Sequence, residues 1–174
     1  RVLPASLGGW TVGVLVQTNF GGVLQVLGAP VGRELGSYAF QNATREDAGD
    51  GSVIIVIATD APIGDRNLGR VASRAMMGLG RTGSSASNGS GDYALAFSTA
   101  ASVRRAWDAS RLTTTELANE EMSAVFQATV EAVEEAVTGE AGQRLDERLA
   151  AHPAREELPD QLRAQLAGAV EAAG

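Results

Sequence analysis

The sequence predicts an α/β fold in which short buried strands alternate with amphipathic helices. Residues 53–58 are all apolar and five of the six are β-branched, which is typical of a strand buried on both faces. Apolar residues recur at helical spacing between Leu68 and Leu79, and again along residues 119–137. A further strand is expected at residues 93–97. Strands and helices that alternate in this way indicate a mixed α/β domain.

The first third of the chain is expected to contain two strands and a long loop. Residues 10–18 are rich in Val and Thr and predict a strand. Residues 19–22 form a turn signal that leads to a partner strand at 23–27, so we expect a hairpin. Residues 28–51 show no periodicity and contain several glycines, which predicts an accessible surface loop.

Two helices are expected after the central strand. Asp60 is a candidate N-terminal cap of the first helix, which is expected to end near Gly78. The second covers residues 119–137, because its apolar residues share one face and Gly139 follows as a stop signal. Residues 140–174 are polar with narrow apolar seams and predict short peripheral helices.

Composition excludes several classes of function. The net charge is −7 and the pI is near 4.7, so a nucleic-acid partner is not expected. No apolar run approaches the roughly 18 residues needed to span a bilayer, so a membrane is not expected as a partner either. Cysteine and lysine are absent, and the single histidine, His152, lies in a polar segment beside Pro153. We therefore predict no metal, no cofactor and no Cys, Lys or His base.

Ser52, just before the central apolar run, is the most informative chemical signal. Asp50 and Gly51 precede it as a turn signal, which places a hydroxyl after an accessible peptide bond. A serine nucleophile needs a base, and an α-amino group, with a pKa of about 7.7–8.0, becomes available if the chain is cut between Gly51 and Ser52. A serine-hydrolase interpretation is thereby narrowed to an N-terminal-nucleophile mechanism. The alternative is that Ser52 simply begins a core strand.

Other polar positions have a structural and a chemical interpretation. Asn19 is either a turn residue or an amide donor to a developing oxyanion. Ser90 and Asp92 flank a glycine just before a strand, which is typical of an ordinary turn but also lets the chain approach a site closely. The G-x-G-x-x-G string at residues 78–83 follows a helix and not a strand, so it does not favour nucleotide binding.

Four ordered segments resemble the DmpA-type family of L-aminopeptidase/D-Ala-esterase/amidases and β-aminopeptidases. They are residues 11–21, 51–62, 80–84 and 88–99, and the similarity extends over about residues 8–137. The resemblance implies a four-layer α/β/β/α sandwich, with two stacked sheets between helical layers, like that of other N-terminal-nucleophile hydrolases and of the ornithine acetyltransferases.

The resemblance also implies roles for individual residues. A precursor of this family cleaves itself, here between Gly51 and Ser52, and Ser52 then acts as the nucleophile with its freed amine as the general base. Ser90 and Asp92 match the helper serine and acidic residue, and Asn19 matches the oxyanion-hole asparagine. The implied substrate is a small peptide, amide or ester with a free amine. The implied assembly is a homo-oligomer of α/β pairs.

The domain organisation expected from this resemblance has three parts. Residues 1–51 belong to the end of the α-subunit portion, residues 52–139 form the β-subunit core with the nucleophile strand, and residues 140–174 are peripheral. Because a strand follows soon after Arg1, we expect a domain that is incomplete at its N-terminus. The compartment stays open between the cytoplasm and a bacterial periplasm. An inactive family member or fragment, or an autoprocessing acyltransferase of related fold, is the alternative function.

Overall fold

The secondary structure combines a small sheet with two long helices. The computed structural model describes residues 1–36, 38, 39, 41 and 51–150, with side chains up to residue 139. Its strands are β1 (Val12–Asn19), β2 (Ser52–Thr59) and β3 (Tyr93–Ser98). Its α-helices are α1 (Val31–Glu34), α2 (Asp65–Arg81) and α3 (Met122–Ala150).

The chain forms two units that interleave along the sequence. The first unit consists of residues 1–16, 54–78 and 93–133, and the second of residues 17–53, 79–92 and 134–174. The first contains most of the sheet with the helices that pack on it. The second contains the start of β2 and the turn that precedes β3.

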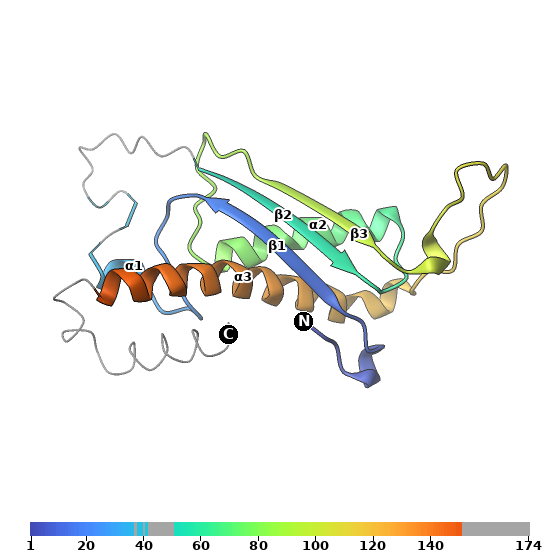
Figure 1. Ribbon diagram of the computed structural model, residues 1–174, viewed down its shortest axis with the longest axis horizontal. Helices are drawn as coiled ribbons and strands as arrows, with labels where there is room; N and C mark the ends of the chain where they lie inside the picture. The colour runs from blue at the N-terminus through green and yellow to red at the C-terminus, as the bar shows by residue number, and fades with distance from the viewer. Residues whose placement is uncertain (37, 40, 42–50, 151–174) are drawn as a thin grey trace. The chain divides into compact units, whose positions relative to one another are not determined.

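A three-stranded mixed sheet with the order β1-β2-β3 forms the centre of the first unit (Figure 1). β2 and β3 are parallel, beginning with Ile54 opposite Tyr93. β1 runs in the opposite direction, and the main-chain N–H of Thr11 near its start donates to Oδ1 of Asp60 just after β2 (2.7 Å). α2 follows β2 and precedes β3, so a helix makes the crossover that two parallel strands require.

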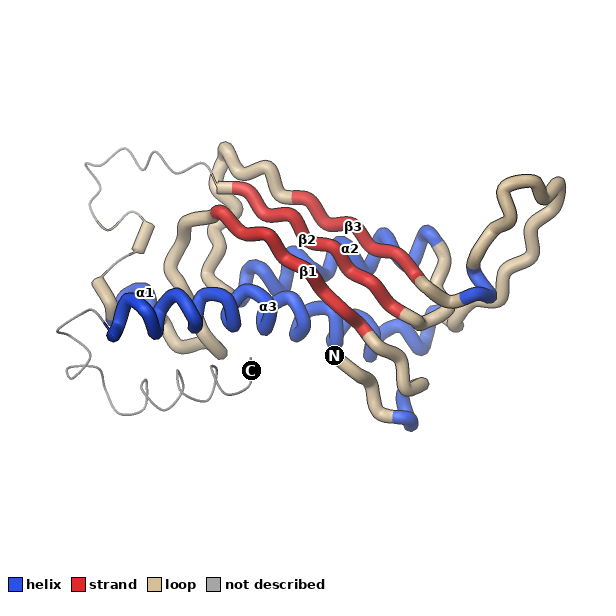
Figure 2. Tube along the Cα trace, in the orientation of Figure 1, coloured by secondary structure: helices blue, strands red, loops and turns tan. Residues whose placement is uncertain are grey.

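Two helices cover one face of this sheet (Figure 2). Alternate side chains of β2 point into the resulting core, where Ile55 and Ile57 are 0% exposed. α2 and α3 contribute residues three or four positions apart, which places one face of each helix against the strands. Fully buried helical residues of this unit include Val71, Ala75, Val125 and Val133. The α/β class predicted from the sequence is confirmed.

The opposite face of the sheet is open among the described residues, so the prediction that the central strand is buried on both faces is wrong for this structure. Side chains of β2 alternate between buried and more exposed positions, and Ile54 is 44% exposed. Leu15 on β1 and Leu95 and Phe97 on β3 are also exposed. A run of β-branched residues indicates a strand, but it does not indicate how many faces of that strand are covered. The described residues supply one β layer and one α layer of the four expected.

Both long helices differ in extent from their predictions. α2 begins at Asp65, and Asp60 does not cap it, because the Asp60 carboxylate accepts the Thr11 N–H instead. α3 continues through Gly139 to Ala150. A glycine inside a helix costs only about 1 kcal/mol relative to alanine, which is too little to end a helix flanked by strong helix formers. Within the described residues, neither helix is long and apolar enough to cross a membrane.

In the second unit, the segment after β1 lies beside the segment after α2. The N–H of Val23 donates to the carbonyl oxygen of Gly83, and that of Gln25 to the carbonyl oxygen of Thr82, both at 3.0 Å. These amides therefore have partners other than β1, and the predicted partner strand at residues 23–27 does not form. The hairpin prediction was wrong because the main-chain N–H groups of residues 23 and 25 bond to the segment after α2.

Two glycines permit this close approach. A β-carbon on Gly83 would lie 1.8 Å from the carbonyl oxygen of Val23, and one on Gly22 would lie 2.1 Å from the carbonyl oxygen of Gly83. Gly83 also has a φ of +91°, a conformation that other residues rarely adopt. Backbone packing thus accounts for the last glycine of the G-x-G-x-x-G string without a nucleotide.

Candidate active site

Ser52 is the first residue of β2, and its side chain is exposed. Val53 follows it directly and is fully buried, which anchors the strand beside the hydroxyl. The Ser52 hydroxyl oxygen accepts a hydrogen bond from the main-chain N–H of Gly91 (3.4 Å). The predicted nucleophile therefore lies at an exposed strand start, next to the turn that precedes β3.

That turn brings the predicted helper residues to Ser52. The Ser90 hydroxyl donates to Oδ1 of Asp92 (2.8 Å). The main-chain N–H of Val53 donates to the same carboxylate oxygen (3.1 Å). Asp92 is thus bonded directly to Val53, the neighbour of Ser52, and Ser90 is bonded to Asp92, although the two segments are far apart in sequence.

Asp92 is the acidic residue of this cluster. Its Oδ1 accepts two hydrogen bonds, while its Oδ2 accepts none from another described residue. A carboxylate used in this way orients its neighbours through one oxygen and keeps the other available to a donor or a cation. Within the part of the chain that the structure describes, no group of three or more His, Cys, Asp or Glu side chains is arranged to hold a metal ion.

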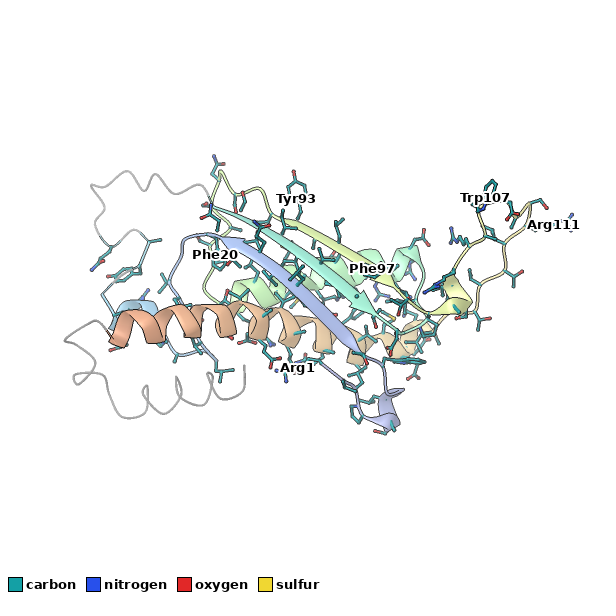
Figure 3. All side chains as sticks on the ribbon, viewed as in Figure 1. Arg1, Phe20, Tyr93, Phe97, Trp107 and Arg111 are labelled. Carbon is teal, nitrogen blue, oxygen red and sulfur yellow. The ribbon has the colours of Figure 1, made fainter. Side chains whose placement is uncertain are left out.

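The end of β1 lies against the residue that precedes Ser52. A β-carbon on Gly51 would lie 2.6 Å from the carbonyl oxygen of Asn19 and 2.5 Å from Cα of Phe20, which Figure 3 labels where β1 ends. Gly51 is buried by this contact, which corrects the expectation of an accessible residue. The Asn19 side chain is exposed and makes no hydrogen bond with another described residue. The part of Asn19 that lies against Gly51 is therefore its main chain.

Sequence reasoning found the polar side chains and missed a main-chain group between them. The glycine between Ser90 and Asp92 indicated that the chain can approach a site closely there, but it did not indicate that the Gly91 N–H points at the Ser52 hydroxyl. The direction of an N–H follows from the backbone angles of its turn, and the residue types of a motif do not specify them.

Comparison with known proteins identifies relatives of most of this chain. The family model described as peptidase family S58 matches residues 1–140. The beta-peptidyl aminopeptidase BapA of Sphingosinicella microcystinivorans is 42% identical over 150 residues, which cover 79% of this chain and 38% of that protein. The chain therefore spans 38% of the length of this curated relative.

Two solved structures are also similar. A beta-aminopeptidase from Burkholderia sp. superimposes with a TM-score of 0.61 and 40% identity over 78% of this chain and 38% of that one. The L-aminopeptidase D-Ala-esterase/amidase from Ochrobactrum anthropi superimposes with a TM-score of 0.54 and 30% identity over 74% of this chain and 39% of that one. The latter is described as a prototype for the serine aminopeptidases and a new variant among the Ntn hydrolase fold. The predicted relation to N-terminal-nucleophile hydrolases is confirmed.

Proposed function

This chain belongs to peptidase family S58, and on that premise we propose that the protein is a serine aminopeptidase that cleaves itself between Gly51 and Ser52. In this proposal the processed protein removes N-terminal residues from small peptides, amides or esters. The observation that carries the proposal is the hydrogen-bonded group of Ser52, Gly91, Ser90 and Asp92 at the start of β2.

The base in this proposal is the α-amino group that self-cleavage creates on Ser52. Its ordinary pKa of about 7.7–8.0 leaves part of it unprotonated near neutral pH. This amine takes the proton of the Ser52 hydroxyl as Oγ attacks the substrate carbonyl carbon, and it passes that proton to the leaving amine. Water then attacks the ester on Ser52, with the same amine as base, and releases the acid.

Asn19, Ser90 and Asp92 have supporting roles in this proposal. The Asn19 amide donates to the oxyanion that forms when the carbonyl is attacked, a contact worth about 2.7–4 kcal/mol in comparable sites. Asp92 orients the Ser90 hydroxyl through Oδ1, and its negative charge favours the protonated form of the nearby amine. The exposed Asn19 side chain supports its assignment, and Asp92 Oδ2 accepts no hydrogen bond from another described residue, so it remains available to the amine.

Self-cleavage uses the same hydroxyl on the chain's own carbonyl. Ser52 Oγ attacks the carbonyl carbon of Gly51, the peptide nitrogen leaves as the new α-amine of Ser52, and water releases the Gly51 carboxylate. The contact between Gly51 and the main chain of Asn19 supports this step, because it fixes the position of residue 51 beside the proposed oxyanion donor.

We propose that β-amino residues are the preferred N-terminal residues of the substrate. The relatives named beta-peptidyl aminopeptidase and beta-aminopeptidase are 42% and 40% identical to this chain, against 30% for the L-aminopeptidase. Faster hydrolysis of a β-alanyl p-nitroanilide than of the L-alanyl compound supports this preference, and the reverse order contradicts it.

We also propose that the processed protein is a homo-oligomer of α/β pairs. Light scattering measures its mass, and the mass of a single α/β pair would contradict this proposal.

Replacement of Ser52 tests the proposed activity most simply. Ser52→Ala is expected to abolish hydrolysis of both p-nitroanilides, because it removes the nucleophile. Ser87→Ala is the matched control, since Ser87 belongs to the same turn and takes part in it through its carbonyl oxygen. Equal activity of Ser52→Ala and Ser87→Ala would contradict the proposal. If the original protein and both variants all failed to hydrolyse the substrate, the result would favour an inactive family member.

A further inference from the structure

We propose that the main-chain N–H of Gly91 is a positioning group for the nucleophile, which orients the Ser52 hydroxyl and takes up part of the negative charge that develops on its oxygen. The inference rests on the proposed function, in which Ser52 is the nucleophile. The Gly91 N–H is the one donor to Ser52 Oγ among the residues that the structure describes, at 3.4 Å.

The Gly91 N–H is held in its direction from both sides. Before it, the Ser90 hydroxyl is bonded to Oδ1 of Asp92 (2.8 Å), which closes a small ring around Gly91. After it, the same Oδ1 accepts the N–H of Val53 (3.1 Å), the residue that follows Ser52. The first of these bonds holds the turn together and the second joins the turn to the strand, so both support the position of the Gly91 N–H beside Ser52. A donor fixed in this way needs no reorientation during reaction.

The length of this hydrogen bond fits a contact that strengthens during the reaction. At 3.4 Å it lies beyond the usual 2.7–3.2 Å range, so it stabilises the neutral hydroxyl weakly. Hydrogen bonds to charged acceptors shorten to about 2.7–2.9 Å and are roughly twice as strong as neutral ones. When the O–H bond of Ser52 breaks and its proton moves to the α-amine, the oxygen gains charge and the Gly91 N–H remains its partner. Such an interaction favours the transition state over the ground state.

Gly91 and Asn19 would then act on different oxygens. Asn19 is proposed to bind the oxygen of the attacked carbonyl, whereas Gly91 binds the oxygen that attacks. Oγ of Ser52 also receives an electron pair when the ester intermediate breaks down, so the same N–H assists both halves of the reaction. Because the donor is a main-chain group, Gly91→Ala retains it, and replacement of side chains alone does not reveal it.

The test replaces the Gly91 amide with an ester by incorporating glycolic acid at position 91, which removes the N–H and adds no side chain. The readout is the rate at which a sulfonyl fluoride modifies Ser52, followed by intact mass on the fragment that begins at Ser52. We expect the rate to fall about ten-fold or more. We also expect the pH–rate curve to move to higher pH, because the positive end of the N–H dipole disfavours the protonated amine and favours the charged oxygen.

A matched control separates this role from a purely structural one. Glycolic acid at Gly89 makes the same chemical change at an exposed N–H that bonds to no other described residue, and it is expected to leave both the rate and the pH curve unchanged. Equal labelling of the two ester variants would overturn the inference. An original protein that is neither cut nor labelled at Ser52 would instead overturn the proposed function on which it rests.

Discussion

The two faces of β2 are built from the same residue types but have different surroundings. Val53, Ile55 and Ile57 on one face are completely buried, whereas Ile54 on the other face is 44% exposed. Ser52 belongs to the exposed set, because side chains two apart in a strand share a face. The covered face therefore stabilises the fold, while the open face begins with the group proposed to carry the chemistry. Substitutions on the two faces should therefore have separable effects.

The largest expected difference is in stability, between two adjacent isoleucines of β2. Ile55→Ala leaves a cavity in a fully buried site and is expected to lower the free energy of unfolding by about 2–5 kcal/mol. Ile54→Ala removes a side chain that water already reaches, so its effect should be less than half as large. Urea denaturation followed by circular dichroism measures both. Equal losses would mean that the open face is covered in solution.

The next largest effect is on activity: a substitution on the open face should lower kcat while leaving stability almost unchanged. Asn19→Ala is expected to lower kcat by about 10²–10³-fold, because it removes the proposed oxyanion donor, with little change in stability since the side chain is exposed. Gln17→Ala, two residues earlier on the same face of β1, is the control and should retain activity. A drop of similar size in Gln17→Ala would show that the effect does not depend on the amide of Asn19.

A smaller effect is expected from two glycines of α2, one facing α3 and one facing solvent. A β-carbon on Gly78 would lie 2.6 Å from the carbonyl oxygen of Val130, so Gly78→Ala should destabilise the fold by about 1–3 kcal/mol. Gly69 has nothing within 4 Å of such a carbon, so Gly69→Ala should stabilise it by about 0.5–1 kcal/mol. Thermal unfolding should give shifts of opposite sign, and shifts of the same sign would contradict the packing of α2 on α3.

The smallest expected effect comes from arginines at the edge of the covered face. The guanidinium of Arg74 lies 4.0 Å from the ring centroid of Phe126, so Arg74→Gln should cost about 0.5–1 kcal/mol through loss of this cation–π contact. Arg66→Gln, two turns earlier on an exposed position of the same helix, should change stability by less than about 0.5 kcal/mol. Urea denaturation of both variants checks the difference. A larger loss in Arg66→Gln would contradict it.

The sequence named candidate site residues but could not specify the contacts between them. The resemblance to the family named Ser52, Ser90 and Asp92 together, and in the structure their two segments meet because β2 and β3 are parallel neighbours. The Gly91 N–H could not be predicted, since its direction depends on backbone angles. The burial of Gly51 could not be predicted either, because it results from the approach of β1, which is distant in sequence.

In the fold as well, elements with a local sequence pattern could be predicted, whereas contacts between distant segments could not. Periodicity identified β2, α2 and α3, whose apolar patterns are repeated over many residues. The strand expected at residues 23–27 failed because its amides bond to Thr82 and Gly83, partners that no local pattern specifies. Burial on both faces failed as a prediction because a β-branched run is compatible with one or two covering layers.

Self-cleavage by Ser52 is tested by the intact mass of the purified protein, measured beside Ser52→Ala and Ser87→Ala. We expect two fragments that divide between Gly51 and Ser52 in the original protein and in Ser87→Ala. In Ser52→Ala we expect a single uncut chain, because that variant lacks the attacking hydroxyl. A single uncut mass in all three folded proteins, or fragments that persist in Ser52→Ala, would contradict the claim that Ser52 is the nucleophile of self-cleavage.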